Sequence, residues 1–195
     1  MPKHRPRRVV LFAFEGAQLL DVTGPLQILA AVNDEQPDAY EIAIAAREKG
    51  ELKTSSGIRL VADASYVKPP KDFFSNIDTL MVAGGEGTEA ATRDRELIAA
   101  IRAAAPKARR LASVCTGAFI LGVAGLLKNK RATTHWSAAH LLARNFPNTK
   151  VDPDAIFIRD GKTWTSAGVT AGMDLALALV REDFGDEMSL AIARR

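Results

Sequence analysis

The sequence predicts an α/β protein with three layers, in which helices cover both faces of a mostly parallel central sheet. Short apolar runs typical of buried strands alternate along the chain with longer segments of helical periodicity. The chain has 195 residues, 47% hydrophobic and 25% charged, which suits one domain with a sizeable core. We expect that domain to cover residues 9–195, after a basic tail over residues 1–8.

The first two predicted strands flank a helix. Val9–Phe14 is an unbroken apolar run and indicates a buried strand. Pro25 is suited to the first turn of a helix that continues through Val32. Tyr40–Ala46 alternates between apolar and polar residues and is rich in isoleucine, so it predicts the second strand.

The middle of the chain repeats this alternation. The turn residues Thr54–Gly57 precede an extended segment, Ile58–Ala62. Ile77–Ala83 is another apolar run and predicts a strand. Glu89–Ala105 is rich in alanine and places its larger apolar residues on one face, which predicts a helix that Pro106 ends.

The second half of the chain predicts further strands and helices in the same order. We expect a strand at Arg110–Val114 and a short strand at Arg131–Thr134. Helices are expected at Phe119–Leu127 and Ser137–Arg144, and a hairpin at Ile156–Trp164. Thr170–Phe184 predicts a long apolar helix with Gly185 as its C-cap. A last amphipathic helix, capped by Asp186, is expected to begin at Glu187 and reaches Arg195 without a signal that ends it. Either this helix frays at its end, or the chain was cut from a longer one.

Cys115, the only cysteine, lies where a predicted strand turns sharply into a helix, and Thr116-Gly117 follows it. A thiol at this position meets the positive end of a helix and several free backbone N–H groups. These groups stabilise a thiolate and bind an oxyanion or carboxylate. The alternative is an inert buried residue, because free cysteine is among the most buried residue types.

Other segments are expected to meet this cysteine, because sites in open α/β sheets form at the carboxyl ends of strands. Gly84 and Gly85 end one strand, and their N–H groups could complete an oxyanion hole with that of Thr116. Asp21 lies in an apolar stretch after the first strand, where it either caps a helix or serves the site with a raised pKa. His135 ends a short strand and either faces the thiol or is structural.

Small residues at the end of the predicted hairpin, Ser166 and Gly168, could leave room for a ligand beside the thiol. One cysteine excludes an intramolecular disulfide and a zinc site with several thiolates, and the presence of only three histidines argues against any metal site. We expect no cofactor.

Composition also bounds the location and the partners. The net charge is +3, and no basic stripe with interleaved aromatic residues indicates nucleic-acid binding by this segment itself. Neither a membrane span nor a signal peptide is evident, so we expect a cytoplasmic protein without membrane contact.

Four motifs together resemble the ThiJ/PfpI superfamily: Gln18–Pro25, Val82–Gly87, Ala112–Ala118 and Arg131–Trp136. The resemblance covers the chain from Val9 and implies a flavodoxin-like sandwich similar to the class I glutamine amidotransferase domain. It implies that Cys115 occupies a nucleophile elbow, that Asp21 contacts the thiol and that His135 lies nearby. It also implies that Gly85 and Thr116 supply backbone N–H groups. We expect a ligand to contact a set of five residues: Gly84, Gly85, Thr116, Gly117 and Ser166.

The residue after the cysteine narrows the choice within this superfamily. Protease-like and glyoxalase-like branches carry histidine there, and this chain has Thr116, which argues against peptidase activity. The Cys-Thr-Gly form with Asp21 resembles isocyanide hydratase and the sensor domain of AraC-type transcription regulators. Four later segments look like the regulator branch: Phe146–Asp154, Trp164–Gly172, Glu182–Gly185 and Ala191–Arg194.

We therefore expect the N-terminal, ligand-sensing domain of an AraC-type regulator, which binds a small metabolite at a Cys115/Asp21 pocket. The resemblance implies a homodimer and DNA contact only through a C-terminal helix-turn-helix domain absent from this chain. The alternative is a hydratase with Cys115 as nucleophile and Asp21 as general acid/base. A redox-sensing thiol is a third hypothesis.

Overall fold

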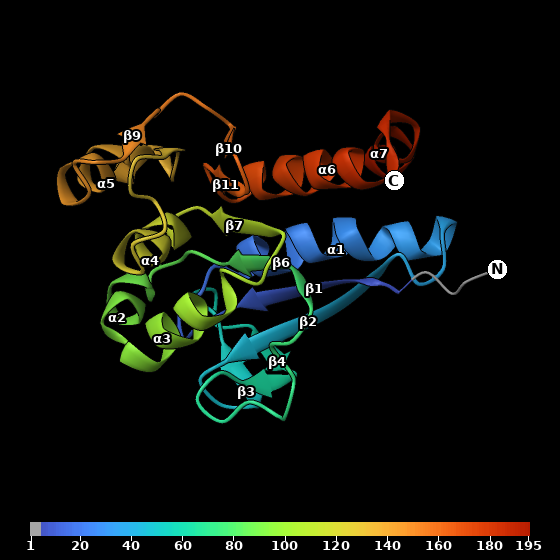
Figure 1. The fold of residues 1–195 in the computed structure, drawn as a ribbon, viewed down its shortest axis with the longest axis horizontal. Coiled ribbons are helices and arrows are strands. Elements are labelled where there is room, and N and C mark those ends of the chain that lie inside the picture. Colours follow the sequence, from blue (N-terminus) through green and yellow to red (C-terminus); the bar gives the residue numbers. More distant parts are fainter. Residues whose placement is uncertain (1–4) are drawn as a thin grey trace.

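A computed structural model of the protein describes residues 5–195, and Figure 1 shows its fold. A seven-stranded sheet has the order β10-β11-β7-β6-β1-β2-β5. All neighbouring strands of this sheet pair in parallel except β10 and β11, which form an antiparallel hairpin. The mostly parallel sheet is the one that the sequence predicts.

The strands are β1 (Arg7–Phe12), β2 (Tyr40–Ala46), β3 (Gly50–Lys53), β4 (Arg59–Ala62), β5 (Ala64–Ser65), β6 (Ile77–Val82), β7 (Arg110–Val114), β8 (Arg131–Ala132), β9 (Lys150–Val151), β10 (Phe157–Asp160) and β11 (Thr163–Ser166). The helices are α1 (Leu19–Glu35), α2 (Thr88–Arg93), α3 (Arg95–Ala104), α4 (Gly117–Val123), α5 (Ala139–Asn145), α6 (Ala171–Phe184) and α7 (Asp186–Ala193), with a 3₁₀ turn at Trp136–Ala138. Within residues 5–195, no helix combines the length and apolar character needed to cross a membrane.

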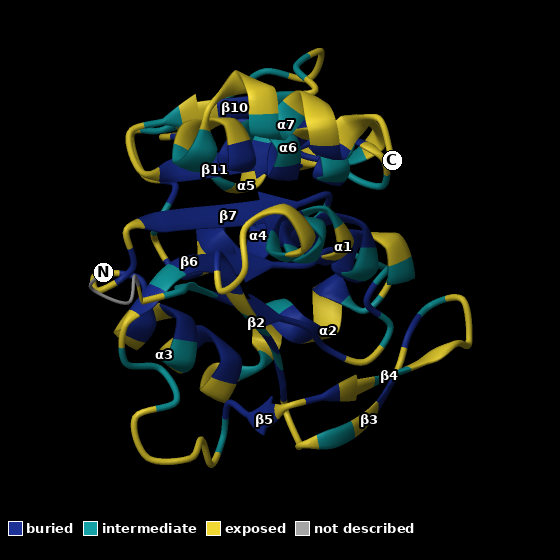
Figure 2. Cartoon of the chain, turned by 90° about the vertical axis from the view of Figure 1, so that its right-hand side faces the viewer, coloured by how far each residue is buried: buried dark blue, intermediate teal, exposed yellow. Residues whose placement is uncertain are grey.

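Helices cover both faces of the sheet, as expected. Helices α1 and α6 lie side by side on one face with α7 beside them, and α3 and α4 lie on the other face (Figure 1). The central strands are buried between these layers, and Figure 2 shows β6 and β7 within the dark core. Residues 9–13 of β1 and the following turn are fully buried, in accord with their unbroken apolar run.

Strand predictions agree closely with the structure where the apolar pattern is strong. Strands β2 and β7 have the predicted bounds, and the hairpin of β10 and β11 turns at Gly161 and Lys162. Helix α6 ends at Gly185, whose φ of +88° suits a glycine. Strand β1 begins at Arg7, so it includes two residues of the expected basic tail. Residues 1–4 of that tail lie outside the described residues.

Helix α1 begins six residues before the predicted position. Gln18 is its N-cap, with the side chain accepting a hydrogen bond from the N–H of Leu19, and Pro25 lies inside the helix rather than in its first turn. The segment before Pro25 packs closely on α6: a Cβ on Gly24 would lie 3.0 Å from Cγ of Met173. Tertiary packing therefore outweighs the low helix propensity of this segment.

The single helix predicted over Glu89–Ala105 is two helices. Asp94 separates them, because its side chain accepts hydrogen bonds from the N–H groups of Glu96 and Leu97 and caps α3. Three smaller differences concern helix starts: α4 begins at Gly117, the expected Ser137 helix is a 3₁₀ turn followed by α5, and Gly185 rather than Asp186 precedes α7 as its N-cap. Strand β3, which pairs with β4, was not predicted.

A buried cluster of ion pairs around Asp183 links the end of α6 to the amino ends of the strands. The guanidinium of Arg110 is 2% exposed and lies 2.6 Å from the carboxylate of Asp183, which is 1% exposed. Arg109 and Arg7 also pair with Asp183, and the hydroxyl of Tyr40 donates to it over 2.6 Å. The carboxyl ends of the strands, at the opposite edge, carry the predicted site.

Candidate functional site around Cys115

Cys115 lies directly after β7 with a φ of +55°, a left-handed conformation that is uncommon for residues other than glycine. Its N–H donates to the carbonyl of Ser166 over 3.0 Å, and its carbonyl accepts from the hydroxyl of Thr134 over 2.7 Å. These two bonds fix the sharp turn between β7 and α4. The residue is 7% exposed, so the thiol is nearly enclosed.

Asp21, in the first turn of α1, is the acidic neighbour of the thiol. It is fully buried, and its Oδ1 accepts a hydrogen bond from the N–H of Val169 over 2.9 Å. Its Oδ2 has no hydrogen-bond partner among the described residues. Burial raises the pKa of Asp21, while the N–H groups of Val169 and Gly84, the thiol and the charge of His135 oppose the rise.

Burial is also the main influence on the thiol. Together with the charge of Asp21 it raises the pKa of Cys115 to about 12, although the backbone N–H of Thr116 acts in the opposite direction. A thiol with this pKa is protonated at neutral pH. The helix N-terminus therefore does not produce the stable thiolate that the sequence suggested as one possibility.

Gly168 closes the space above the sulfur. A Cβ built on Gly168, whose φ is +104°, would lie 2.4 Å from Cβ and 2.8 Å from Sγ of Cys115. The small residue therefore allows the chain to approach the thiol and does not leave room there for a ligand, contrary to the expectation. The next residue, Val169, has a φ of +49°, which is strained for a β-branched side chain.

The paired glycines lie beside the elbow, and the N–H of Gly84 is directed at the carboxyl group of Asp21. The N–H of Gly85 donates to the hydroxyl of Thr116 over 2.9 Å, so it is not available to an oxyanion in this conformation. A Cβ on Gly84 would lie 2.6 Å from the backbone nitrogen of Thr116, which requires glycine there. Of the three amides expected to bind charge, that of Thr116 is the one beside the sulfur.

The remaining predicted residues surround this centre without touching the thiol directly. Nδ1 of His135 lies 2.8 Å from the hydroxyl of Ser137, and no hydrogen bond joins it to Cys115 among the described residues. The hydroxyl of Ser166 is buried and lies 3.4 Å from the carbonyl of Ser113 in the neighbouring strand. Gly117 is the first residue of α4.

Sequence reasoning missed Thr134, which fixes the carbonyl of Cys115, and Val169, which holds Asp21. The motif around Thr134 was noted only for its histidine. No sequence pattern marks Val169, because its conformation depends on the packing of Gly168 against the elbow.

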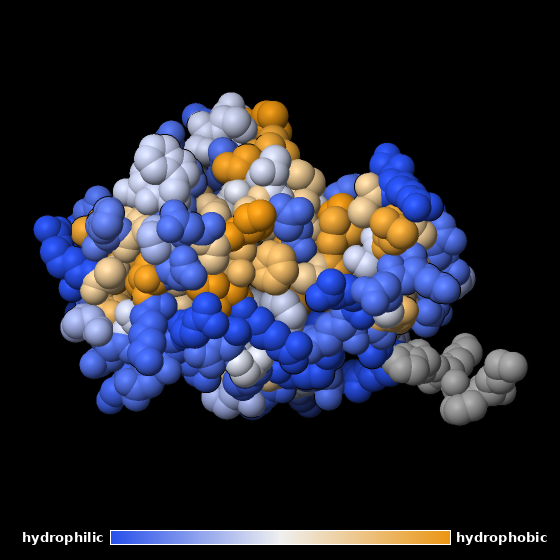
Figure 3. Space-filling model, turned by 90° about the horizontal axis from the view of Figure 1, so that it is seen from above, coloured by the Kyte–Doolittle hydropathy of each residue, from blue (hydrophilic) through white to orange (hydrophobic). Residues whose placement is uncertain are grey.

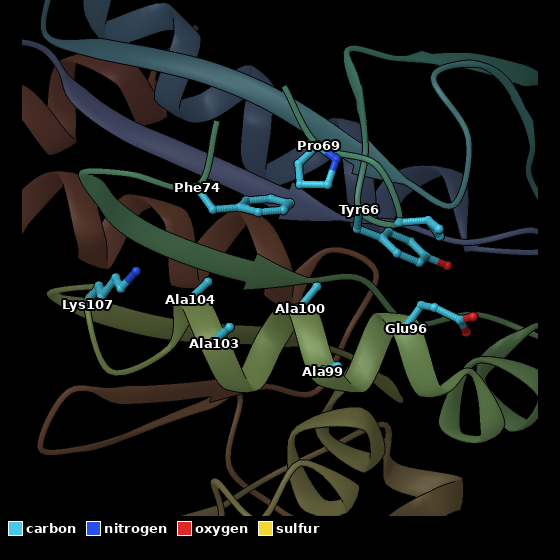
Figure 4. A pocket seen from close by; sticks show the side chains of 10 residues that line it. Tyr66, Pro69, Phe74, Glu96, Ala99, Ala100, Ala103, Ala104 and Lys107 are labelled. Carbon is cyan, nitrogen blue, oxygen red and sulfur yellow. The ribbon is translucent and has the colours of Figure 1, made fainter. Parts of the chain in front are cut away.

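One cavity adjoins the site and another does not. A cavity of about 450 Å³ between α2, α4 and α5 reaches Thr116. A second cavity, of about 410 Å³, lies between α3 and the chain after β5; Figure 4 shows its alanine-lined floor facing Phe74 and Tyr66. This second cavity contains none of the predicted site residues. Within residues 5–195, no group of three histidine, cysteine or acidic side chains is placed to hold a metal ion.

Two kinds of chemistry fit this arrangement. Asp21 can exchange a proton with Cys115, because both groups are buried with raised pKa values and lie side by side. Oδ2 of Asp21 is buried without a hydrogen-bond partner among the described residues, so it can accept a hydrogen bond from a molecule that displaces the chain covering it. The first would make the thiol a nucleophile only after proton transfer, whereas the second needs no reaction.

Comparison with known proteins connects this geometry to a family. The DJ-1/PfpI family matches residues 7–182. The isonitrile hydratase of Pseudomonas putida is 36% identical over 174 residues, which span 88% of this chain and 70% of the hydratase. A ThiJ/PfpI family protein from Pseudomonas syringae, 30% identical, superposes with a TM-score of 0.84 over 99% of this chain and 75% of its own.

The chain is also similar to transcription regulators. The HTH-type regulator GbdR of Pseudomonas aeruginosa is 27% identical over 194 residues, which span 98% of this chain and 51% of the regulator. The chain thus covers about half the length of this relative. An AraC family regulator structure from Pseudomonas putida shares the fold, with a TM-score of 0.80 at 23% identity over 97% of this chain and 98% of its own. On the family match and the similarity to the ThiJ/PfpI structure, the chain belongs to the DJ-1/PfpI family.

Proposed function

We propose that this domain is the ligand-sensing part of an AraC-type transcription regulator and binds a small molecule at the carboxyl edge of its sheet. The relationship to regulators supports this reading, because GbdR aligns with 98% of the chain and the hydratase with 88%. DNA contact would belong to a helix-turn-helix domain outside this chain.

The state of Cys115 is the observation that carries the proposal. The residue is 7% exposed, Gly168 lies against it, and its pKa is raised to about 12. A nucleophile needs access and a populated thiolate, and this thiol has little of either. Recognition by hydrogen bonding needs no thiolate, and because Oδ2 of Asp21 is buried, a ligand would reach it by displacing the segment at Gly168 and Val169.

The fold also offers a route from the site to the rest of a regulator. The segment that holds Asp21, Gly168–Thr170, leads directly into α6, and α6 leads through Gly185 into α7. A ligand that displaces Val169 from Asp21 would move the start of α6. Such a ligand shifts a two-state equilibrium by its differential affinity for the two positions.

The second candidate function is hydration of an isocyanide, which the 36% identity to isonitrile hydratase favours. Asp21 would take the thiol proton, sulfur would bond to the isocyanide carbon, and that carbon would receive the proton, giving a thioimidate. Water would then add across the C=N bond, and the carbon–sulfur bond would break as the hydroxyl proton returns to the sulfur, giving an N-substituted formamide. One water molecule is consumed and the thiol is regenerated.

The source reading frame beyond Arg195 tests the regulator proposal. We expect roughly 100 further residues that contain two helix-turn-helix patterns. A stop codon directly after Arg195 would contradict it and favour the enzyme.

We also propose that the protein is a cytoplasmic homodimer, since regulators that read two half-sites use two-fold symmetry. Figure 3 shows apolar side chains between charged ones on the face that carries α5, α6 and α7. The large apolar side chains of Trp136, Ile156 and Leu190 are exposed. Sedimentation equilibrium should give twice the chain mass of 21.0 kDa. A mass of 21.0 kDa at every concentration would contradict the dimer.

A further inference from the structure

The cavity beside Thr116 has two chemically different walls. Its volume of about 450 Å³ is within the range of small-molecule sites. Part of its lining, the polar wall, carries the hydroxyl groups of Thr88, Thr92 and Thr116. The apolar wall includes Phe119, Leu141 and Phe146.

The hydroxyl protons on the polar wall are already donated within the protein. Thr88 donates to the carbonyl of Gly85 over 2.7 Å, so Thr116 supplies the proton of the 2.7 Å bond between the two hydroxyls. Thr92 donates to the carbonyl of Glu89 over 2.7 Å. Since each hydroxyl has one proton and two lone pairs, this wall offers a ligand only acceptors.

A ligand that binds the polar wall must bring the hydrogen-bond donors. A primary ammonium group has three N–H donors, which matches three hydroxyl oxygens. The rings of Phe119 and Phe146, whose centroids lie 6.4 Å apart, offer apolar surface to the body of such a ligand. At the rim, Arg93 forms an exposed ion pair with Glu89 over 2.6 Å.

We infer that this cavity binds a small primary ammonium compound with an apolar body, its nitrogen on the three threonine hydroxyls and its body between Phe119, Leu141 and Phe146. This inference deepens the proposed sensing function and rests on it for its biological meaning. Thr116 connects the cavity to the elbow, because its hydroxyl accepts from the N–H of Gly85 and its own N–H lies beside the thiol. A ligand in the cavity would therefore change the hydrogen bonding around Cys115.

Benzylammonium is a suitable probe for calorimetry with the full chain, because its ring fits the apolar wall. Benzyltrimethylammonium carries the same charge and body but has no N–H donor, and we expect it to bind at least about tenfold more weakly. Equal binding of the two probes, or no binding of benzylammonium at millimolar concentration, would overturn the inference.

Two exposed leucines provide matched variants that should fold. Leu141 lines the cavity and is 42% exposed, whereas Leu190 on α7 is 52% exposed and lies outside the cavity. Leu141→Arg should weaken benzylammonium binding by about tenfold or more through bulk and like charge, and Leu190→Arg should leave it unchanged. Equal effects of the two substitutions would place the probe elsewhere.

Thr116 tests the polar wall directly. Thr116→Val removes the acceptor oxygen and should weaken binding about fivefold or more, while Thr116→Ser keeps the oxygen and should restore it. If the valine variant does not fold, the leucine pair and the two probes still decide the question. If the probe binds and a stop codon follows Arg195, the regulator proposal is wrong and the cavity site stands. If the reading frame encodes a regulator and the probe does not bind, the cavity site is wrong and the regulator proposal stands.

Discussion

Cys115 and Asp21 are two acids held side by side in one buried place, and burial raises both pKa values. Asp21 keeps one carboxylate oxygen on the N–H of Val169 and leaves the other without a partner among the described residues. A negative charge on either group disfavours a charge on the other, so the pair titrates as a unit. The protonated thiol at neutral pH follows from this arrangement.

Asp21→Asn should make Cys115 more reactive, because it removes the charge that helps to raise the pKa of the thiol. In the natural protein, alkylation by iodoacetamide should rise about tenfold per pH unit from about pH 7 to about pH 10, since the thiolate fraction is far from saturation. In the variant the same curve should lie about one pH unit lower. An unchanged curve would show that Asp21 does not influence the thiol.

Gly168→Ala should destabilise the protein, because the new Cβ would lie 2.4 Å from that of Cys115. Gly125→Ala is the matched control: Gly125 also has a positive φ, of +80°, and a Cβ added there would meet no atom within 4 Å. Urea unfolding should show a loss at least about 2 kcal/mol greater for Gly168→Ala than for the control. Equal losses would mean that only backbone strain matters at Gly168.

At the scale of elements, strands were predicted better than helix starts. Strand β7 is recognisable because an apolar run in a parallel sheet is buried on both faces, so composition alone marks it. The start of α1 was not predictable from Pro25, since the packing of Gly24 and Pro25 on α6 is long-range information. Asp94 could have been recognised as a cap, but the alanine-rich pattern around it favoured one continuous helix.

Asp183→Asn should cost about 3 kcal/mol or more at neutral pH, because it leaves Arg110 buried without its ion-pair partner. Burial alone would raise the pKa of Asp183, but the charge of Arg110 and the bonds from Tyr40 and Arg109 lower it below its usual value. The stabilisation is therefore fully present above the unfolded pKa of about 3.9 and is lost as the pH falls through the folded pKa.

Urea unfolding of Asp183→Asn at several pH values checks this. The difference from the natural protein should be greatest near neutral pH and should shrink below about pH 4. Asp186→Asn is the control, because the Asp186 side chain is 87% exposed and its ion pair with Arg181 should contribute less than about 0.5 kcal/mol. A difference that persists undiminished in acid would contradict the charge-based explanation.

At the scale of the whole molecule, the site exists because the strand order brings separate segments to one edge. Strands β1, β6 and β7 are neighbours, so Asp21, Gly84 and Cys115, which follow them, meet at their carboxyl ends. The meeting of these residues could be expected from the sequence on this ground. Two other features could not be predicted: the hydrogen bond from the N–H of Gly85 to Thr116, and the contact of Gly168 with Cys115. Both depend on side-chain and loop packing that no sequence pattern encodes.

Isocyanide turnover tests most directly whether this domain recognises a ligand or acts as an enzyme. The protein and its Cys115→Ala variant should be incubated with a panel of alkyl and aryl isocyanides, and the N-substituted formamide should be measured by chromatography. Because the thiol is protonated and covered, we predict that the two proteins give the same formamide yield as buffer. Formamide production that depends on Cys115 would contradict the sensing role and establish the hydratase.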